Sequence, residues 1–107
     1  MNLNTFQALA EPNRLQIIEL LRTSPRSVNE ISSMLHFGQP KTSKHLRVLA
    51  DSGLVLKQTV AQQRIYSINT KPMQELEDWA AKMAKVWDAR FNRLDKILAK
   101  EKTKHGK

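Results

Sequence analysis

The chain has 107 residues, with 18 lysines and arginines against 10 aspartates and glutamates, so its formal net charge is +8. A single small domain of this length leaves much of its surface uncovered, which favours dimerisation. The positive charge favours polyanionic partners, although a merely soluble basic protein would have the same balance. The absence of cysteine excludes disulfides, thiolate metal sites and a cysteine nucleophile.

The sequence contains neither a membrane-spanning segment nor a recognisable catalytic motif. No apolar run is long enough to span a bilayer, and residues 1–5 do not begin a signal peptide. There is no glycine-rich phosphate loop and no plausible pair of nucleophile and base. The acidic neighbours Glu77 and Asp78 would point apart on a helix. We therefore expect a cytoplasmic protein that is not an enzyme and has no cofactor or membrane partner.

Two helices are expected before residue 25. Leu3, Phe6 and Leu9 recur at helical spacing and predict a short first helix. Glu11 and Pro12 then begin a second helix, because proline fits a first turn and an acidic residue complements the helix dipole. Its predicted apolar face consists of Leu15, Ile17, Ile18 and Leu21.

The next two helices have the spacing of a helix-turn-helix. The run from Ser27 to Glu30 has the form of a capping box, which predicts a third helix over residues 28–36. Only Phe37 and Gly38 separate it from a fourth helix over roughly residues 39–52, and we expect Gly38 to make the sharp turn between them. Gly53 fits the left-handed residue that closes a helix.

The fourth helix has two chemically different faces. Thr42, Leu46 and Leu49 are four and three residues apart, so they share one face, which we expect to be buried. Basic and polar residues cover the remaining surface, which is typical of a helix that contacts an anionic partner.

A β-hairpin follows, because the period changes between residues 54 and 68 and β-branched residues become frequent. Its expected tip, residues 61–63, lacks the glycine or asparagine that tight hairpin turns prefer, which predicts a longer or looser wing. Arg64 is expected near the edge of this wing, with Lys57 across the hairpin.

A long last helix is predicted from Pro72 to about Lys100, with Thr70 as its cap. Apolar residues recur along it at steps of three and four, over a length that a small hairpin could not cover. The lysine-rich tail, residues 101–107, is expected to be disordered. Residues 1–100 are thus one expected domain: mainly α with a small β-hairpin, an α+β winged helix-turn-helix.

Two motifs give the chain a family resemblance. The run from Ser43 to Leu49, followed by Gly53, resembles the recognition helix of the ArsR/SmtB family of winged-helix transcriptional regulators, and the run from Leu9 to Leu15 resembles the family's amino-terminal motif. The resemblance implies a homodimeric repressor whose last helix pairs with the first helix of each subunit. The expected dimer interface consists of Leu3, Phe6, Leu9, Met83, Trp87, Phe91, Leu94 and Leu98.

The expected DNA contacts lie on the fourth helix and the wing. A major groove admits one helix, and its base edges and phosphates favour basic and polar side chains. The candidates are Gln39, Lys41, Thr42, Ser43, Lys44, His45, Arg47, Lys57 and Arg64. A two-fold dimer predicts an inverted-repeat operator in double-stranded DNA. Alternative functions are a winged helix used for protein contacts and a non-specific architectural DNA-binding protein.

The family's usual metal sites are not expected here. Aligned on Glu30, the positions of the metal-binding cysteines in metal-responsive members hold Ser27 and Asn29, and the last helix contains no histidine among residues 72–99. We therefore predict no metal site. The sequence leaves three means of regulation open: a small molecule at the dimer interface, a partner protein, or the abundance of the protein itself.

Overall fold

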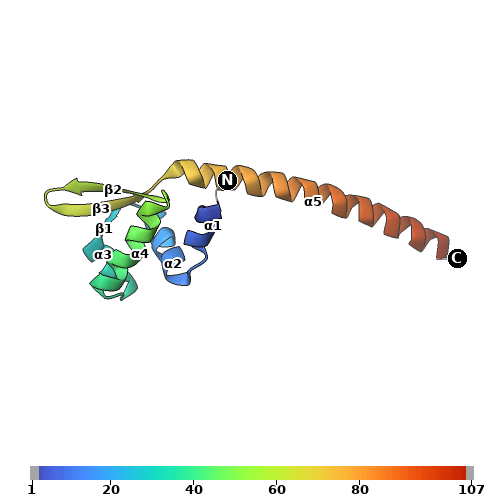
Figure 1. Ribbon diagram of the computed structural model, residues 1–107. Coiled ribbons are helices and arrows are strands. Elements are labelled where there is room, and N and C mark those ends of the chain that lie inside the picture. Colours follow the sequence, from blue (N-terminus) through green and yellow to red (C-terminus); the bar gives the residue numbers. More distant parts are fainter. Residues whose placement is uncertain (1–2, 106–107) are drawn as a thin grey trace. The chain divides into compact units, whose positions relative to one another are not determined.

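The computed structural model describes residues 3–105 and the side chains of residues 3–99. This part of the chain forms five helices and three strands in the order α-α-β-α-α-β-β-α (Figure 1). Their bounds are α1 Leu3–Leu9, α2 Pro12–Leu21, β1 Arg26–Ser27, α3 Val28–Leu35, α4 Gln39–Asp51, β2 Val55–Val60, β3 Gln63–Ile68 and α5 Thr70–His105. The expected fold class, mainly α with a small antiparallel sheet in a winged helix-turn-helix, is confirmed.

Both predicted helix starts are confirmed. The side chain of Glu11 caps α2 by accepting a hydrogen bond of 2.9 Å from the backbone amide of Arg14, and Pro12 occupies the first turn. At the start of α3, the amide of Glu30 donates to the Ser27 hydroxyl and the amide of Ser27 donates to the Glu30 carboxylate. This reciprocal capping box satisfies two backbone groups that the helix itself cannot pair.

The turn between α3 and α4 is made by a different residue from the one predicted. His36 has the left-handed conformation, with φ of 58°, and its amide donates to the carbonyl of Ser32. Gly38 instead has φ of −65° and lies just before α4. The prediction placed the sharp turn at Gly38 because glycine adopts left-handed angles most easily, but histidine also enters this region at modest cost. Gly53, with φ of 78°, closes α4 as expected.

The wing is tighter than predicted. Val60 pairs with Gln63, so only Ala61 and Gln62 form the loop, and both have positive φ, 49° and 68°. These angles match the two-residue hairpin turns whose twist fits the flanking strands. The prediction of a longer or looser loop was wrong because it relied on residue preference, whereas the strand pairing imposes the turn on residues that seldom adopt it.

A third strand was not predicted. β1 pairs antiparallel with β3, where Arg26 lies opposite Tyr66 and Ser27 opposite Ile65, and the strand order of the sheet is β1-β3-β2. A strand of two residues is too short to show any periodicity in sequence. It attaches the wing to the start of α3 through backbone hydrogen bonds.

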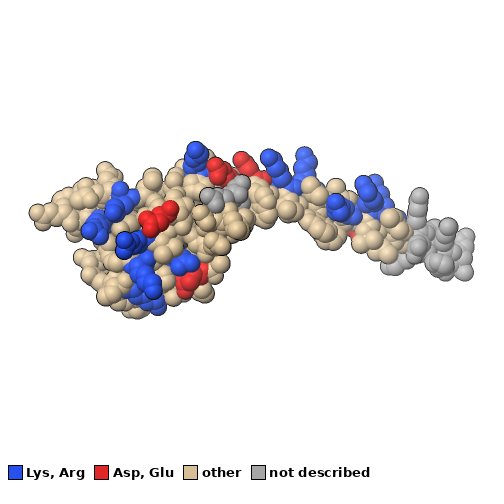
Figure 2. Space-filling model, viewed as in Figure 1, with Lys and Arg blue, Asp and Glu red and all other residues tan. Residues whose placement is uncertain are grey.

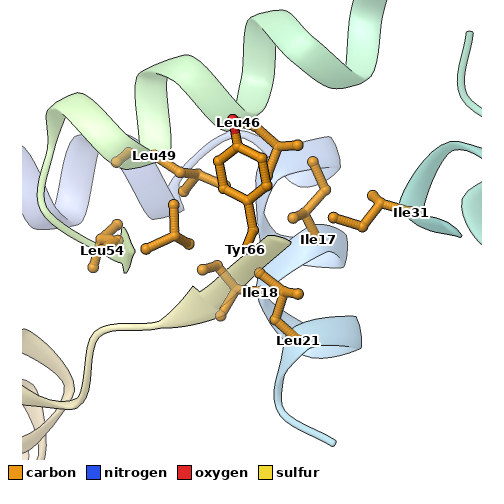
Figure 3. Packing of buried hydrophobic residues seen from close by; sticks show 10 residues of the cluster. Ile17, Ile18, Leu21, Ile31, Leu46, Leu49, Leu54 and Tyr66 are labelled. Carbon is orange, nitrogen blue, oxygen red and sulfur yellow. The ribbon is translucent and has the colours of Figure 1, made fainter. Parts of the chain in front are cut away.

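The core lies where α2, α3 and α4 meet β3 (Figure 3). It contains Ala8, Ile17, Ile18, Leu21, Ile31, Leu46, Leu49, Leu54, Val55 and Tyr66. Leu15 was expected on the buried face of α2, but it is 45% exposed; Met34, on α3, is 48% exposed. On α2 the buried face is therefore rotated toward Ile17, and on α3 it includes Ser32.

The apolar residues of α1 do not form its inner face. Thr5 and Ala8 are the buried residues of this helix, Leu9 packs partly against the core, and Leu3 and Phe6 are 69% and 37% exposed. Small side chains allow α1 to lie close to its neighbours. The larger apolar side chains of Leu3 and Phe6 are consequently directed outward.

The last helix begins earlier and ends later than predicted. It starts at Thr70, so Thr70 is not its cap; instead, the side chain of Asn69 accepts a hydrogen bond from the amide of Lys71. The helix continues to His105, while residues 106–107 and the side chains from Lys100 onward lie outside the described residues. The chain divides into two compact units, one reaching to Gln74 and the other beginning at Glu75. No helix in the described part of the chain is both long and apolar enough to cross a membrane.

Candidate nucleic-acid interface

The outer face of α4 is basic and exposed. Lys41, Ser43, Lys44 and Arg47 are all exposed, whereas Leu46 and Leu49, on the inner face, are fully buried. This division follows from the helical period, because residues three and four apart share a face. The packing of Leu46 and Leu49 therefore fixes which side chains α4 presents outward.

Thr42 does not belong to this outer face. Its side chain is fully buried, and its hydroxyl donates to the carbonyl of Gly38 at 3.0 Å. The same oxygen accepts a hydrogen bond of 2.9 Å from the hydroxyl of Ser32. The prediction of Thr42 as a DNA contact was wrong, since its buried hydroxyl donates within the start of α4 and accepts the bond that joins α3 to α4.

His45 is also turned inward. Its side chain is 12% exposed, and its Nδ1 lies 3.8 Å from a carboxylate oxygen of Glu11, at the start of α2. The prediction that His45 lies on the DNA-facing surface was wrong, because its imidazole packs inward, where the carboxylate of Glu11 faces it. The spacing of residues within α4 alone could not reveal a partner more than thirty positions earlier in the chain.

Five of the predicted contact residues come together in one hollow of about 520 Å³, which we call the basic hollow. Ser43, Lys44 and Arg47 line it from α4, and Lys57 and Arg64 line it from the hairpin. Its remaining lining residues are Pro40, Ala50, Asp51 and Tyr66. In Figure 2 the basic side chains gather on this side of the winged helix, over α4 and the hairpin.

The strand register explains how the two hairpin cations reach the same hollow. Lys57 lies opposite Tyr66, and Arg64 lies opposite Thr59. Positions 57 and 59 face the same side of β2, so Lys57 and Arg64 are diagonal neighbours on one face of the ribbon rather than a directly opposed pair. Four cations and one carboxylate, Asp51, therefore share the hollow, which gives it a net positive charge suited to phosphate.

Gln39 and Lys41 lie outside the basic hollow. The amide of Gln39 donates a hydrogen bond to the side chain of Asn29 on α3. The ammonium of Lys41 lies 4.4 Å from the centre of the Phe37 ring, a cation–π contact. Both side chains remain exposed at the amino end of α4.

Two lining residues were missed by the sequence interpretation. Tyr66 is 6% exposed and belongs to the core, yet it also forms a wall of the hollow. Asp51 supplies the only carboxylate among the hollow's lining residues and lies in the last turn of α4. Neither side chain is basic, so neither was a candidate DNA contact. Only the folded structure shows that both lie beside the cations.

The charges of two capping carboxylates are stabilised locally. The pKa of Glu30 is lowered because its carboxylate accepts hydrogen bonds from the backbone and side chain of Ser27. For Glu11, partial burial raises the pKa, but the hydrogen bond from the amide of Arg14 and the proximity of His45 more than offset this, so the net pKa is lowered. Within the described residues, no three potential metal ligands of the types His, Cys, Asp and Glu gather in one place.

Comparison with known proteins identifies this arrangement. The sequence profile described as "Bacterial regulatory protein, arsR family" matches residues 11–57, which include the helix-turn-helix. The arsenical resistance operon repressor of Bacillus subtilis is 32% identical over 72 residues, covering 66% of this chain and 69% of that protein. The chain belongs to the ArsR family.

Other ArsR-family relatives agree in sequence and in fold. The transcriptional repressor SdpR of Bacillus subtilis is 28% identical over 76 residues, covering 71% of this chain and 84% of SdpR. The homodimeric winged helix-turn-helix DNA-binding domain of Mb0332 from Mycobacterium bovis has a TM-score of 0.65 and 27% identity, covering 77% of this chain and 76% of that one. The protein is accordingly a DNA-binding transcriptional regulator and not an enzyme, which favours the first of the three functions considered from sequence.

Proposed function

We propose that this ArsR-family regulator is a homodimeric repressor that binds a short inverted-repeat operator in the cytoplasm and competes there with RNA polymerase. The observation that carries the assignment of the DNA surface is the basic hollow, in which α4 and the hairpin contribute cations to one place. A recognition helix alone could be an ordinary solvated face. Cations converging from two separate elements are better explained by a shared anionic partner.

The two parts of this surface would have different tasks. The exposed side chains at the amino end of α4, with Gln39 and Ser43 among them, would enter the major groove, where amide and hydroxyl groups can read base edges. Lys44, Arg47 and Lys57 would hold phosphate groups in the basic hollow, which positions the helix without reading sequence. Arg64, on the wing, would contact the adjacent phosphates or the minor groove.

Dimerisation would use apolar side chains that are exposed in the single chain. On α1 these are Leu3 and Phe6, with Leu9 beside them, and on α5 they are Met83, Trp87, Phe91, Leu94 and Leu98. Burying such side chains against a second copy removes apolar area from water. We place the dimerisation helix and the winged helix in one functional domain of residues 1–100, followed by a basic tail.

Two-fold symmetry would set the operator geometry. Two recognition helices in successive major grooves lie about 34 Å apart, which corresponds to half-sites separated by one helical turn of DNA. Release from the operator would depend on a small molecule or a partner protein. The similarity to two repressors, the arsenical resistance operon repressor and SdpR, supports repression as the direction of control.

The proposal is tested by fluorescence anisotropy with the DNA upstream of the protein's own gene and a scrambled duplex of the same length. We expect tight binding with a clear preference for the upstream DNA, and an affinity that falls steeply as salt is raised, because cations displace counterions from phosphate. Equal affinity for both duplexes would support the architectural function instead. Failure to bind either duplex would contradict the proposal and favour a protein-contact function.

The direction of control needs a separate measurement. A reporter gene under the upstream DNA should be less active when the protein is present and more active when its gene is deleted. Higher reporter activity in the presence of the protein would show an activator.

A further inference from the structure

Three helices meet at the residues that begin α2. The carboxylate of Glu11 caps α2 through the amide of Arg14, at 2.9 Å. The guanidinium of Arg14 in turn donates to the carbonyls of Ala8, at 2.7 Å, and Gln7, at 3.3 Å. These carbonyls lie at the carboxyl end of α1, so Arg14 joins α1 to the start of α2.

The same carboxylate faces the recognition helix. Nδ1 of His45 is buried and has no hydrogen-bond partner among the described residues, and it lies 3.8 Å from Oε2 of Glu11. This distance is an ion-pair distance and is too long for a direct hydrogen bond. Burying a polar atom without a hydrogen-bond partner costs free energy. For Nδ1, the negative charge of Glu11 that faces it offsets this cost.

The carboxylate also decides which ring nitrogen carries the proton. An unprotonated Nδ1 would direct its lone pair toward a negative charge, which is repulsive. A protonated Nδ1, in the neutral ring or in the imidazolium, is attracted to Glu11. The interaction therefore holds α4 against α2 only when the proton is on Nδ1.

We propose that Glu11 and His45 are positioning residues, which fix the recognition helix α4 on the junction of α1 and α2 and thereby orient its DNA-reading face. This inference rests on the proposed DNA-reading role of α4. Arg14 extends the connection to α1, whose exposed Leu3 and Phe6 belong to the proposed dimer surface. The junction would thus couple the orientation of each recognition helix to the dimer.

Variants of each partner separate the contact from helix capping. Glu11→Ser keeps an oxygen that can cap α2 but removes the carboxylate, whereas Glu11→Asp keeps both the cap and the charge. His45→Leu removes the donor, and His45→Asn places an amide nitrogen where Nδ1 lies. Glu30→Ser is the matched control, because it also removes a capping carboxylate but Glu30 faces no histidine in its capping box.

The contact between Glu11 and His45 can be tested by the ¹⁵N chemical shifts of the His45 ring nitrogens. In a ¹⁵N NMR spectrum of the full chain without DNA, we expect the proton of His45 to be on Nδ1. In Glu11→Ser it should move to Nε2, while Glu11→Asp and Glu30→Ser leave it on Nδ1. An unprotonated Nδ1 in the wild-type protein, or a spectrum unchanged by Glu11→Ser, would overturn the contact.

The positioning role is read from DNA binding, with the upstream and scrambled duplexes as probes. We expect Glu11→Ser and His45→Leu to weaken binding to the upstream DNA about tenfold, with a much smaller change for the scrambled duplex. His45→Asn and Glu11→Asp should restore most of the loss. Equal losses on both duplexes, or no rescue by the conservative variants, would overturn the role.

The two proposals fail in different ways. A wild-type protein that binds neither duplex contradicts the proposed function, while the imidazole spectrum still decides the contact between Glu11 and His45. A wild-type protein that prefers the upstream DNA, together with variants that bind it equally well, contradicts only the positioning role.

Discussion

The winged-helix unit, residues 3–74, and the following part of α5, residues 75–99, use apolar side chains in opposite ways. In the winged-helix unit, Ile17, Ile31 and Leu46 are fully buried. In α5, the large apolar side chains form a stripe at steps of three and four, and each is between 42% and 55% exposed. They are Trp79, Met83, Val86, Trp87, Phe91, Leu94, Ile97 and Leu98.

The winged-helix unit therefore completes its own core, whereas α5 leaves its apolar stripe exposed to solvent. An apolar stripe this long, exposed at every turn, is typical of a helix that packs against a further helix. The basic hollow, in contrast, is complete within the winged-helix unit. DNA contact and dimerisation are therefore expected to respond to different substitutions.

The largest effect is expected in the core. Leu46→Ala removes a fully buried side chain and should destabilise the winged-helix unit by about 2–5 kcal/mol. Its melting temperature should fall to the same extent at every protein concentration. Leu94→Ala is the matched substitution on α5, and there the loss should depend on concentration, because only association buries that side chain. Equal, concentration-independent losses would remove the distinction between the two regions.

A charge on the stripe should break the dimer. Leu94→Glu should give a monomer in analytical ultracentrifugation and lower the affinity for the upstream DNA by about 100-fold, because two linked recognition helices bind far better than one. The circular dichroism spectrum of the winged-helix unit should change little. Lys96→Glu introduces the same residue outside the stripe and should stay dimeric. A dimeric Leu94→Glu would show that α5 is not the interface.

Substitutions in the basic hollow should act on binding alone. Lys44→Ala and Arg47→Ala should each lower DNA affinity and reduce the slope of log affinity against log salt by about one. Their thermal stability should be unchanged, since both side chains are exposed. Arg22→Ala, which removes an exposed cation that does not line the hollow, is the control. Unchanged binding by both hollow variants would contradict the assigned DNA surface.

The smallest expected effect concerns pH. The folded-state pKa values of Glu11 and Glu30 lie below their unfolded values, so their contribution to stability is complete above the unfolded pKa. It is lost as the pH falls through the lowered folded pKa. The melting temperature should therefore decrease on acidification below about pH 4.5, and less steeply in Glu30→Gln. An identical acid dependence in that variant would show that the Glu30 carboxylate does not contribute.

Local signals predicted much of the fold because they depend on neighbouring residues. The capping box at Ser27 and the turn at Gly53 each involve groups within four positions, and both are confirmed. The two-residue wing turn and strand β1 were missed because distant pairing imposes them. Neither Ala61 nor Gln62 signals a left-handed turn by its own preference.

The candidate site was predictable to a lesser extent, for the same reason. Residues Ser43, Lys44 and Arg47 could be placed together from the helical period of α4. Thr42 and His45 were misplaced because Ser32 and Glu11, on other helices, hold them inside. Composition shows which residues can contact DNA, but only tertiary contacts show which are already engaged.

The most direct test is the mass of the protein–DNA complex, measured by sedimentation velocity with a single upstream duplex. We expect two chains per duplex for the wild-type protein, and loss of this complex for both Leu94→Glu and the double variant Lys44→Ala/Arg47→Ala. The first variant should be monomeric without DNA and the second dimeric. A single chain bound to the upstream duplex, with the same preference over scrambled DNA, would contradict the division between a DNA-binding winged helix and a dimerising α5.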